Sequence, residues 1–430
     1  MIMKRITAIL SLFLLMLSCR KETDTILPSI TVVEPSEGSQ YNVLDTINVH
    51  VVLADNEILK DVEVRLVDQQ LTPVMPSMRQ ELNSKQADIT FQYWLGDIRL
   101  LSGNYYLEVK ASDGINTKRM FRGVNITEVP FEYKGFYAVL QPQASQYQLF
   151  RADTFTQPVL WKSESSDFCD MAVNSWWQQV YVNGLYYGPL KTFSIDGNNP
   201  DWSKNAVVGA VPFWGPMQAN GKYTWVNFKA KGQYQQLSSS GSQYFAASVN
   251  SNYAFESALQ VGNRLFTEQK EISSPNRVIV VHSLSGAALQ QSPVNIDIVE
   301  MIAKDNDNLY LFGNENGQGH LLIYDYTTNG TWEPIGLPAG TVISAGMFND
   351  GSLIFSMSNG NVYKFTYNPI SVSVYKGGTF TTLIRVNKAG NNSWLSLEGN
   401  TVKQYSGSMS TDYTYTFPGT PLDIEILYNR

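Results

Sequence analysis

Short stretches in the first part of the chain have an apolar residue at every second position. Three of them are residues 47–53 (INVHVVL), 62–67 (VEVRLV) and 105–111 (YYLEVKA). Because successive side chains of a strand point to opposite faces, a period of two predicts strands with one buried face. An aromatic share of 12% and the lack of long helical periodicity extend this prediction to the whole chain, which we expect to be all-β.

One segment indicates which all-β fold the first part of the chain adopts. Leu101-Ser102-Gly103-Asn104-Tyr105 resembles the tyrosine corner of immunoglobulin-like (Ig-like) sandwiches, in which a tyrosine hydroxyl bonds back to the nearby backbone. The resemblance implies an Ig-like β-sandwich over residues 28–128. No Cys-Trp-Cys core is present, so the domain resembles a bacterial Ig-like or fibronectin-like spacer.

Acidic residues occupy two loops of this predicted sandwich. The loops ADNEILK and ASDGIN would lie at the same end, which brings Asp55, Glu57 and Asp113 together. Ca²⁺ binds carboxylate oxygens of this kind, so these residues are candidate metal ligands. The alternative is a pair of solvated turns, because Asp, Asn and Gly favour turns for their own reasons.

A repeat of 40 to 46 residues runs through positions 131–430. The turn residues that precede each second strand are Gly135, Ser175, Gly221, Asn263, Asn308, Gly351 and Asn392. This period is typical of β-propellers, whose blades have about four strands each, so seven anchors predict seven blades. The segment 421–430, PLDIEILYNR, resembles one more first strand, and we expect it to complete the first blade and close the ring.

Tryptophans divide into predicted core residues and ligand candidates. Trp161, Trp202 and Trp332 recur on the expected outer strands, which indicates blade packing. Phe213 and Trp214 lie in VPFWGPMQANG, where prolines and glycine break any strand, so we expect them on a loop.

Exposed aromatic rings offer apolar area to a sugar or peptide at little entropic cost. Phe213, Trp214 and Trp176 are therefore candidate ligand-binding residues, and His320, in a predicted turn of the fifth blade, is a fourth. Trp176 and Trp177 are expected on a strand, with one ring pointing in and the other out. The alternative for Trp214 is a plug that folds over a blade.

The start of the chain predicts export and a lipid anchor. Lys4 and Arg5 precede the apolar run 6–17, which is shorter than the roughly 20 residues that a membrane-spanning helix needs. Met16-Leu17-Ser18-Cys19 resembles the lipobox of bacterial lipoproteins, and the charged residues that follow resemble the tether of Bacteroidota surface lipoproteins. The resemblance implies a signal peptide (1–18), a lipid on Cys19, a tether (19–27) and the outer membrane. The alternative is an ordinary cleaved signal peptide with an incidental cysteine.

Composition narrows the classes of partner and chemistry. Removal of residues 1–18 lowers the basic count from 31 to 29 while 38 acidic residues remain, so the mature chain carries nine excess negative charges. A nucleic-acid binder would need a basic patch, so we expect no nucleic-acid partner. Cys169 has no second cysteine to pair with once Cys19 is lipidated, and the three histidines lack metal-ligand spacing.

No catalytic constellation or cofactor motif stands out in the sequence. The segment KDNDNLY begins like a calcium loop but has Leu309 at the third ligand position, which favours a blade turn. We therefore expect a lipid-anchored binding protein whose propeller meets a glycan or another envelope protein. Two alternatives remain: a propeller enzyme that acts on polysaccharide through converging acids, and a structural lipoprotein that docks through an apolar patch.

Overall fold

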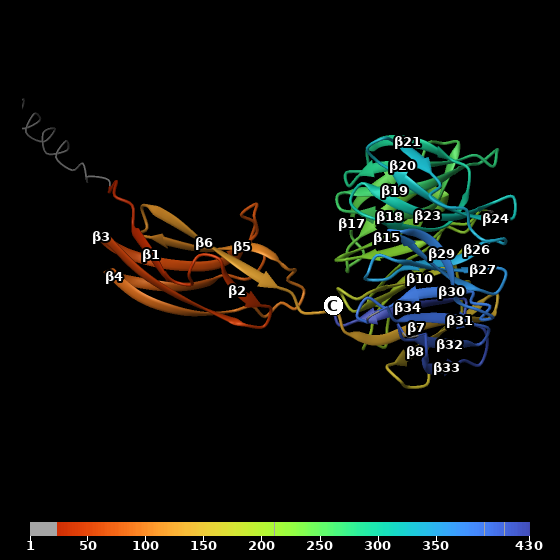
Figure 1. Cartoon of the computed structure of the whole chain (residues 1–430). Coiled ribbons are helices and arrows are strands. Elements are labelled where there is room, and N and C mark those ends of the chain that lie inside the picture. Colours follow the sequence, from red (N-terminus) through yellow and green to blue (C-terminus); the bar gives the residue numbers. More distant parts are fainter. Residues whose placement is uncertain (1–23, 210, 391, 408) are drawn as a thin grey trace, which may run out of the picture. The chain divides into compact units, whose positions relative to one another are not determined.

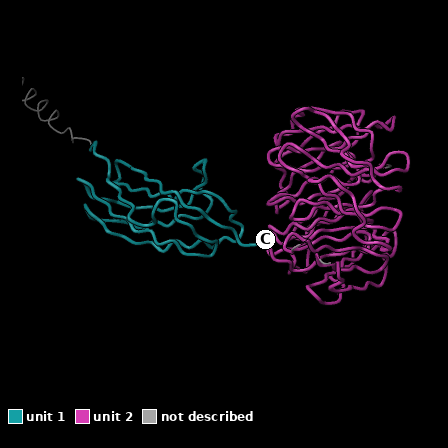
Figure 2. Tube along the Cα trace, in the orientation of Figure 1, with its two compact units in different colours: residues 1–130 teal, residues 131–430 magenta. Residues whose placement is uncertain are grey.

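The chain divides into two compact units, residues 1–130 and 131–430 (Figure 2). The computed structural model describes residues 24–209, 211–390, 392–407 and 409–430. These residues form strands and connecting segments, together with the short 3₁₀ turn η1 (Lys229–Lys231). The all-β prediction is therefore confirmed. Within the described ranges, no helix has the length and hydropathy that crossing a membrane requires.

The first unit is a six-stranded arrangement with sheet order β1-β3-β5-β6-β2, in which β4 also pairs with β3 (Figure 1). Its strands are β1 (Ser29–Glu34), β2 (Ser39–Asn42), β3 (Thr46–Val67), β4 (Met78–Trp94), β5 (Gly103–Ser112) and β6 (Thr117–Thr127). All pairs are antiparallel except β2 with β6, which is parallel.

The long strand β3 pairs with three other strands of this unit. Its first half pairs with β1 and with the second half of β4. Its second half pairs with β5 and with the first half of β4, and the register of β3 with β4 shifts around Leu59. Side chains at every second position of both halves, such as Val49 and Val64, are fully buried and meet in one hydrophobic core. The buried face predicted for residues 47–53 is thus confirmed.

Two polar features stabilise β5. The Tyr105 hydroxyl donates to the Leu101 carbonyl at 2.9 Å, the local bond that the sequence predicts. Glu108 is 1% exposed and accepts from Arg65 Nε at 2.6 Å, while Arg119 Nε lies 3.3 Å from its other oxygen. A buried carboxylate is costly unless it is paired, and here two arginines from the flanking strands supply the pairing.

The second unit contains seven four-stranded antiparallel sheets among its described residues. In strand order, the first four sheets comprise β34 (Asp423–Tyr428), β7 (Tyr133–Gln143), β8 (Gln146–Asp153) and β9 (Val159–Glu164); β10 (Asp170–Asn174), β11 (Gln179–Asn183), β12 (Leu190–Ser194) and β13 (Trp202–Lys204); β14 (Met217–Asn220), β15 (Tyr223–Phe228), β16 (Gln233–Leu237) and β17 (Gln243–Ser248); and β18 (Tyr253–Val261), β19 (Arg264–Glu271), β20 (Arg277–Ser283) and β21 (Ala288–Val294).

The other three sheets follow the same order along the chain. They comprise β22 (Asp297–Ala303), β23 (Asn308–Glu315), β24 (Gln318–Asp325) and β25 (Gly330–Trp332); β26 (Val342–Met347), β27 (Leu353–Met357), β28 (Val362–Tyr367) and β29 (Ile370–Lys376); and β30 (Leu383–Val386), β31 (Trp394–Glu398), β32 (Thr401–Tyr405) and β33 (Thr411–Thr416).

The first strands of these sheets form the inner ring of the unit. Each contacts the first strand of the next sheet, in the cycle β34, β10, β14, β18, β22, β26, β30 and back to β34. The late strand β34 pairs with β7, and the hydrogen-bonded register runs from Asp423 opposite Val139 to Tyr428 opposite Tyr133. Radially arranged four-stranded sheets of this kind define a β-propeller.

Adjacent sheets pack face to face through apolar side chains. Second strands such as β27 are buried at every position, because a neighbouring sheet covers each of their faces. The large rings of Trp225 and Trp394 lie in this core.

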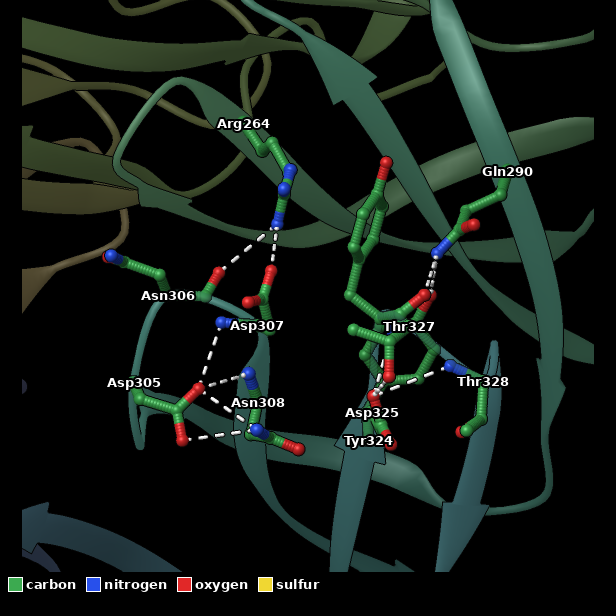
Figure 3. A network of polar contacts seen from close by, with 11 residues as sticks. Arg264, Gln290, Asp305, Asn306, Asp307, Asn308, Tyr324, Asp325, Thr327 and Thr328 are labelled. Carbon is green, nitrogen blue, oxygen red and sulfur yellow. Dashed lines mark hydrogen bonds and ion pairs between the residues drawn. The ribbon is translucent and has the colours of Figure 1, made fainter.

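Polar side chains join two neighbouring sheets at one rim of the ring (Figure 3). Arg264 on β19 donates to Asp307 at 2.7 Å and stacks over the Tyr326 ring at 3.7 Å. Asp305 accepts from the backbone N–H groups of Asp307 and Asn308, both at 2.9 Å. The segment KDNDNLY is therefore a side-chain-capped turn between β22 and β23, which confirms the turn interpretation.

Candidate functional site

The predicted lipidation site cannot be located in this structure. The signal segment 1–18, Cys19 and the first residues of the tether lie outside the described residues. Of the predicted tether 19–27, the structure describes residues 24–27.

The predicted aromatic platform at Phe213 and Trp214 is wrong. Trp214 is 0% exposed and packs against Phe213 and Phe228, with ring centroids 4.8 and 4.6 Å away. Its indole Nε1–H donates to the Gly188 carbonyl at 2.9 Å. The Asp167 carboxylate holds this receiving loop by accepting several of its backbone N–H groups, so Trp214 is the plug that the alternative interpretation describes.

Trp176 and His320 also differ from the predicted placements. Trp176 lies in the turn between β10 and β11 rather than on a strand, and it is half-buried. His320 lies within strand β24, where it pairs with Gly313 of β23, rather than in the preceding turn. The two residues lie on sheets that are not neighbours in the inner cycle, so the structure does not bring them together.

His320 lines a surface groove of about 390 Å³ between two neighbouring sheets. The groove is lined by Pro293, Asn295, Ile296, Glu315, His320, Leu322, Thr331, Trp332 and Glu333. Its apolar residues are a proline, an isoleucine and a leucine, and Trp332 adds an aromatic ring that is 45% exposed. This volume lies within the usual range of small-ligand sites.

Trp332 is the functional candidate that the sequence misses. Trp161 and Trp202, at the matching position of two other sheets, pack against Tyr137 and Tyr181 and are only partly exposed. In the sheet of β22–β25, Trp332 occupies the same position but lies in the wall of the groove. The repeat correctly predicts the outer strand but not the exposure, since exposure depends on the neighbouring sheet.

Two carboxylates and one imidazole supply the titratable side chains of the groove. His320 Nδ1 lies 3.1 Å from Glu333 Oε1, and Glu315 lies at the end of β23 in the same groove. The pair fixes the orientation of the imidazole, and the second carboxylate gives the groove an acidic balance. Such a surface can exchange hydrogen bonds with hydroxyl groups and repels polyanions.

A second polar cluster lies on the inner strands of the ring. Arg385 on β30 donates to Glu425 at 2.8 Å and to Asp423 at 3.1 Å, both on β34. Burial and, to a smaller extent, the charge of Glu425 raise the pKa of Asp170 on β10 and of Glu300 on β22 to about 7. Strands β22 and β34 are not adjacent in the cycle, so these charges act on one another across the centre of the ring.

The predicted metal ligands are only partly brought together. Asp55 and Asp113 lie close to each other as predicted, but the predicted loop of residues 54–60 is wrong, because these residues belong to strand β3. Glu57 is exposed and lies outside the cluster. The third carboxylate is that of Asp24, which the sequence places in the tether. Asn116 joins these segments, because its Nδ2 donates to the Asp24 carbonyl at 3.0 Å.

Comparison with known proteins identifies the fold and no family. No family model matches the chain, and no curated protein matches it either. A solved protein from Lactobacillus plantarum is 15% identical, with a TM-score of 0.52, over 68% of this chain and 98% of its own length. A functionally unknown protein from Desulfotomaculum acetoxidans is 11% identical, with a TM-score of 0.50, over 68% and 99%.

Propellers are also among the similar structures. The WD40 beta propeller domain of Doa1 is 9% identical, with a TM-score of 0.48, over 62% of this chain and 91% of its own. At these identities the likeness concerns the fold alone. The β-propeller architecture of this chain rests on its own ring of four-stranded sheets.

Proposed function

We propose that this chain is a lipid-anchored protein of the bacterial outer membrane whose propeller captures a neutral glycan. In this proposal the lipid on Cys19 holds the chain in the membrane, an Ig-like sandwich acts as spacer, and a seven-bladed ring presents the binding groove. The observation that carries it is the groove of His320 and Trp332, where an exposed ring lies among paired polar groups.

The chemistry of the groove fits a sugar better than an apolar ligand. The exposed face of Trp332 can cover the apolar face of a sugar ring, while Glu315, Glu333 and His320 can exchange hydrogen bonds with hydroxyls. Two carboxylates beside one imidazole disfavour uronic-acid or sulfated polymers. The ligand class that remains is an uncharged polysaccharide.

The test is affinity electrophoresis of the full chain in detergent through gels that contain neutral or acidic polysaccharides. We expect at least one neutral polymer to retard the chain, and Trp332→Ala to weaken that binding about tenfold, or about 1.4 kcal/mol. The matched control is Trp94→Ala, which removes a tryptophan that is 60% exposed on the first unit.

Two results would contradict the proposal. One is retardation that Trp332→Ala and Trp94→Ala reduce equally, and the other is that no neutral polymer retards the chain. Unfolding of Trp332→Ala should change by less than about 0.5 kcal/mol, because the residue is surface-exposed, so lost binding would not reflect lost folding.

A second candidate function is an enzyme that acts on polysaccharide. It is favoured by Asp170 and Glu300, whose pKa values burial raises to about 7, because a carboxyl group that is protonated near neutral pH can serve as a general acid. New reducing ends in the retained polysaccharide, lost in Asp170→Asn or Glu300→Gln, would favour this function over capture alone.

A third candidate is docking to another envelope protein. It is favoured by Val207, Val208 and Val211, which are 72%, 74% and 59% exposed in one connecting segment. Cross-linking to an envelope protein that is lost in Val207→Ser/Val208→Ser, with glycan binding absent, would favour this role.

A further inference from the structure

Three carboxylates from separate segments converge at one end of the first unit. Asp24 precedes β1, Asp55 lies in the middle of β3, and Asp113 follows β5. One oxygen from each side chain lies within 4.8 Å of the other two. The ion pairs of the first unit involve other carboxylates, so no described basic residue neutralises these three.

The environment of the Asp55 carboxylate indicates a bound ligand. Both of its carboxylate oxygens are buried, and neither accepts a hydrogen bond from a described residue. The neighbouring carboxylates differ: Asp113 accepts the backbone N–H groups of Ile115 and Asn116, and Asp24 accepts from Asn56 and Ile26. A buried ionised carboxylate without a partner is costly, so its position beside two more acids calls for a cation.

We propose that Asp24, Asp55 and Asp113 bind one Ca²⁺ ion. Oxygen ligands lie about 2.3–2.6 Å from Ca²⁺, so two ligands of one ion are at most about 5 Å apart, and the observed spread fits this limit. Mg²⁺, with bonds of about 2.1 Å, would require oxygens within about 4.2 Å of one another. A divalent ion also offsets two of the three negative charges.

The site joins the segment that follows Cys19 to strand β3 and to the turn after β5. Asp24 lies five positions after Cys19 in the sequence, while Asp55 and Asp113 belong to the folded core region. The Asn116 amide already bridges Asp24 and Asp113, at 3.2 and 3.3 Å from their Oδ2 atoms. Ca²⁺ therefore fixes the point where the first unit leaves its predicted anchor.

The test is isothermal titration of the full chain in detergent with CaCl₂ after removal of metal by a chelator, and a parallel titration with MgCl₂. We expect Ca²⁺ to bind with a Kd of about 10⁻⁶ to 10⁻³ M and more tightly than Mg²⁺. Asp55→Asn and Asp24→Asn should each weaken binding by at least about tenfold. Glu57→Gln is the matched control, an exposed acid two positions from Asp55, and should change the Kd by less than about twofold.

Thermal unfolding separates loss of the site from loss of the fold. Without metal, Asp55→Asn should melt at least as high as the unaltered chain, because it removes an unpartnered buried charge. Added Ca²⁺ should raise the melting temperature of the unaltered chain and not that of the variant. The proposal is overturned if the unaltered chain binds no Ca²⁺ at about 10 mM, if Asp55→Asn binds as well as the unaltered chain, or if Glu57→Gln loses as much affinity as Asp55→Asn.

Discussion

Glu108 in the first unit is a buried charge, whereas the Arg385 side chain in the second is 25% exposed, and the charges around the two are opposite. Glu108 lies between two arginines whose side chains are 23% and 53% exposed. Arg385 faces Asp423 and Glu425, and its charge also reaches Glu300. The partners of Glu108 include Arg119, which is 53% exposed, whereas the partners of Arg385 include Asp423, which is 8% exposed. We therefore expect removal of the central charge to destabilise the ring more than the first unit.

Arg385→Ala should cause the largest loss. It leaves Asp423, which is 8% exposed, and Glu425 without a cation, and removal of one partner of a buried pair costs about 3 kcal/mol or more. Urea unfolding followed by tryptophan fluorescence measures the ring, since eight of the nine tryptophans follow residue 130.

The exposed pair Lys134–Glu132 supplies the control for Arg385, and Lys134→Ala should change stability by less than about 1 kcal/mol. The double variant Arg385→Ala/Asp423→Asn should recover part of the loss, because it removes the unpaired acid. Unfolding of Arg385→Ala at the same urea concentration as the unaltered chain would contradict the expectation.

Glu108→Ala should cost less, about 2 kcal/mol. The arginines it leaves behind keep contact with water, so their charges are not stranded. Amide hydrogen exchange of β5 and β6, read by mass spectrometry, gives the local stability of the first unit. Equal losses for Glu108→Ala and Arg385→Ala would show that solvation of the remaining partners does not distinguish the two centres, and exposed Glu57→Ala is the control.

The smallest effect should be a dependence of ring stability on pH. The pKa values of Asp170 and Glu300 are raised to about 7, above their values in an unfolded chain, so the folded ring binds more protons in the interval between. The stability that these two groups contribute to the folded ring is therefore fully present below about pH 4. It is lost as the pH rises through about 7.

Asp170→Asn should make the ring less sensitive to this rise, by at least about 1 kcal/mol between about pH 5 and about pH 8. Urea unfolding at the two pH values measures the difference. The first unit, examined by hydrogen exchange under the same conditions, is the internal reference. An unchanged pH dependence in Asp170→Asn would show that this carboxyl is already ionised at about pH 5 in the folded ring.

Local patterns predicted most of the architecture. The spacing of turn residues such as Asn308 and Gly351 anticipates second strands, which begin at or within a few residues of these positions in the structure. Tyr105 makes its predicted bond because the partner is four residues away. Asp55 and Asp113 meet because β3 pairs with β5, and the register ends with Asp61 opposite Ser112 near both residues.

Side-chain exposure and long-range convergence were harder to predict. Trp214, a predicted ligand-binding residue, is buried, whereas Trp332, a predicted packing residue, is exposed. The reason is that burial depends on which sheet packs beside each ring. Asp24 takes the place predicted for Glu57, which lies on strand β3 with its side chain exposed to solvent. The inner cluster draws Asp170, Glu300 and Arg385 from strands more than 80 positions apart, a distance over which sequence periodicity says nothing about contact.

The pairing of β34 with β7 has a consequence for how the protein is made. The sheet that β7, β8 and β9 begin is completed only by residues 423–428, nearly three hundred positions later. A nascent chain therefore holds one unsatisfied strand edge throughout synthesis, and the ring can close only after residue 428 has been released. Until β34 pairs with it, the edge of β7 is open to aggregation. Its protection must come from other components of the cell, because the folded ring does not yet exist.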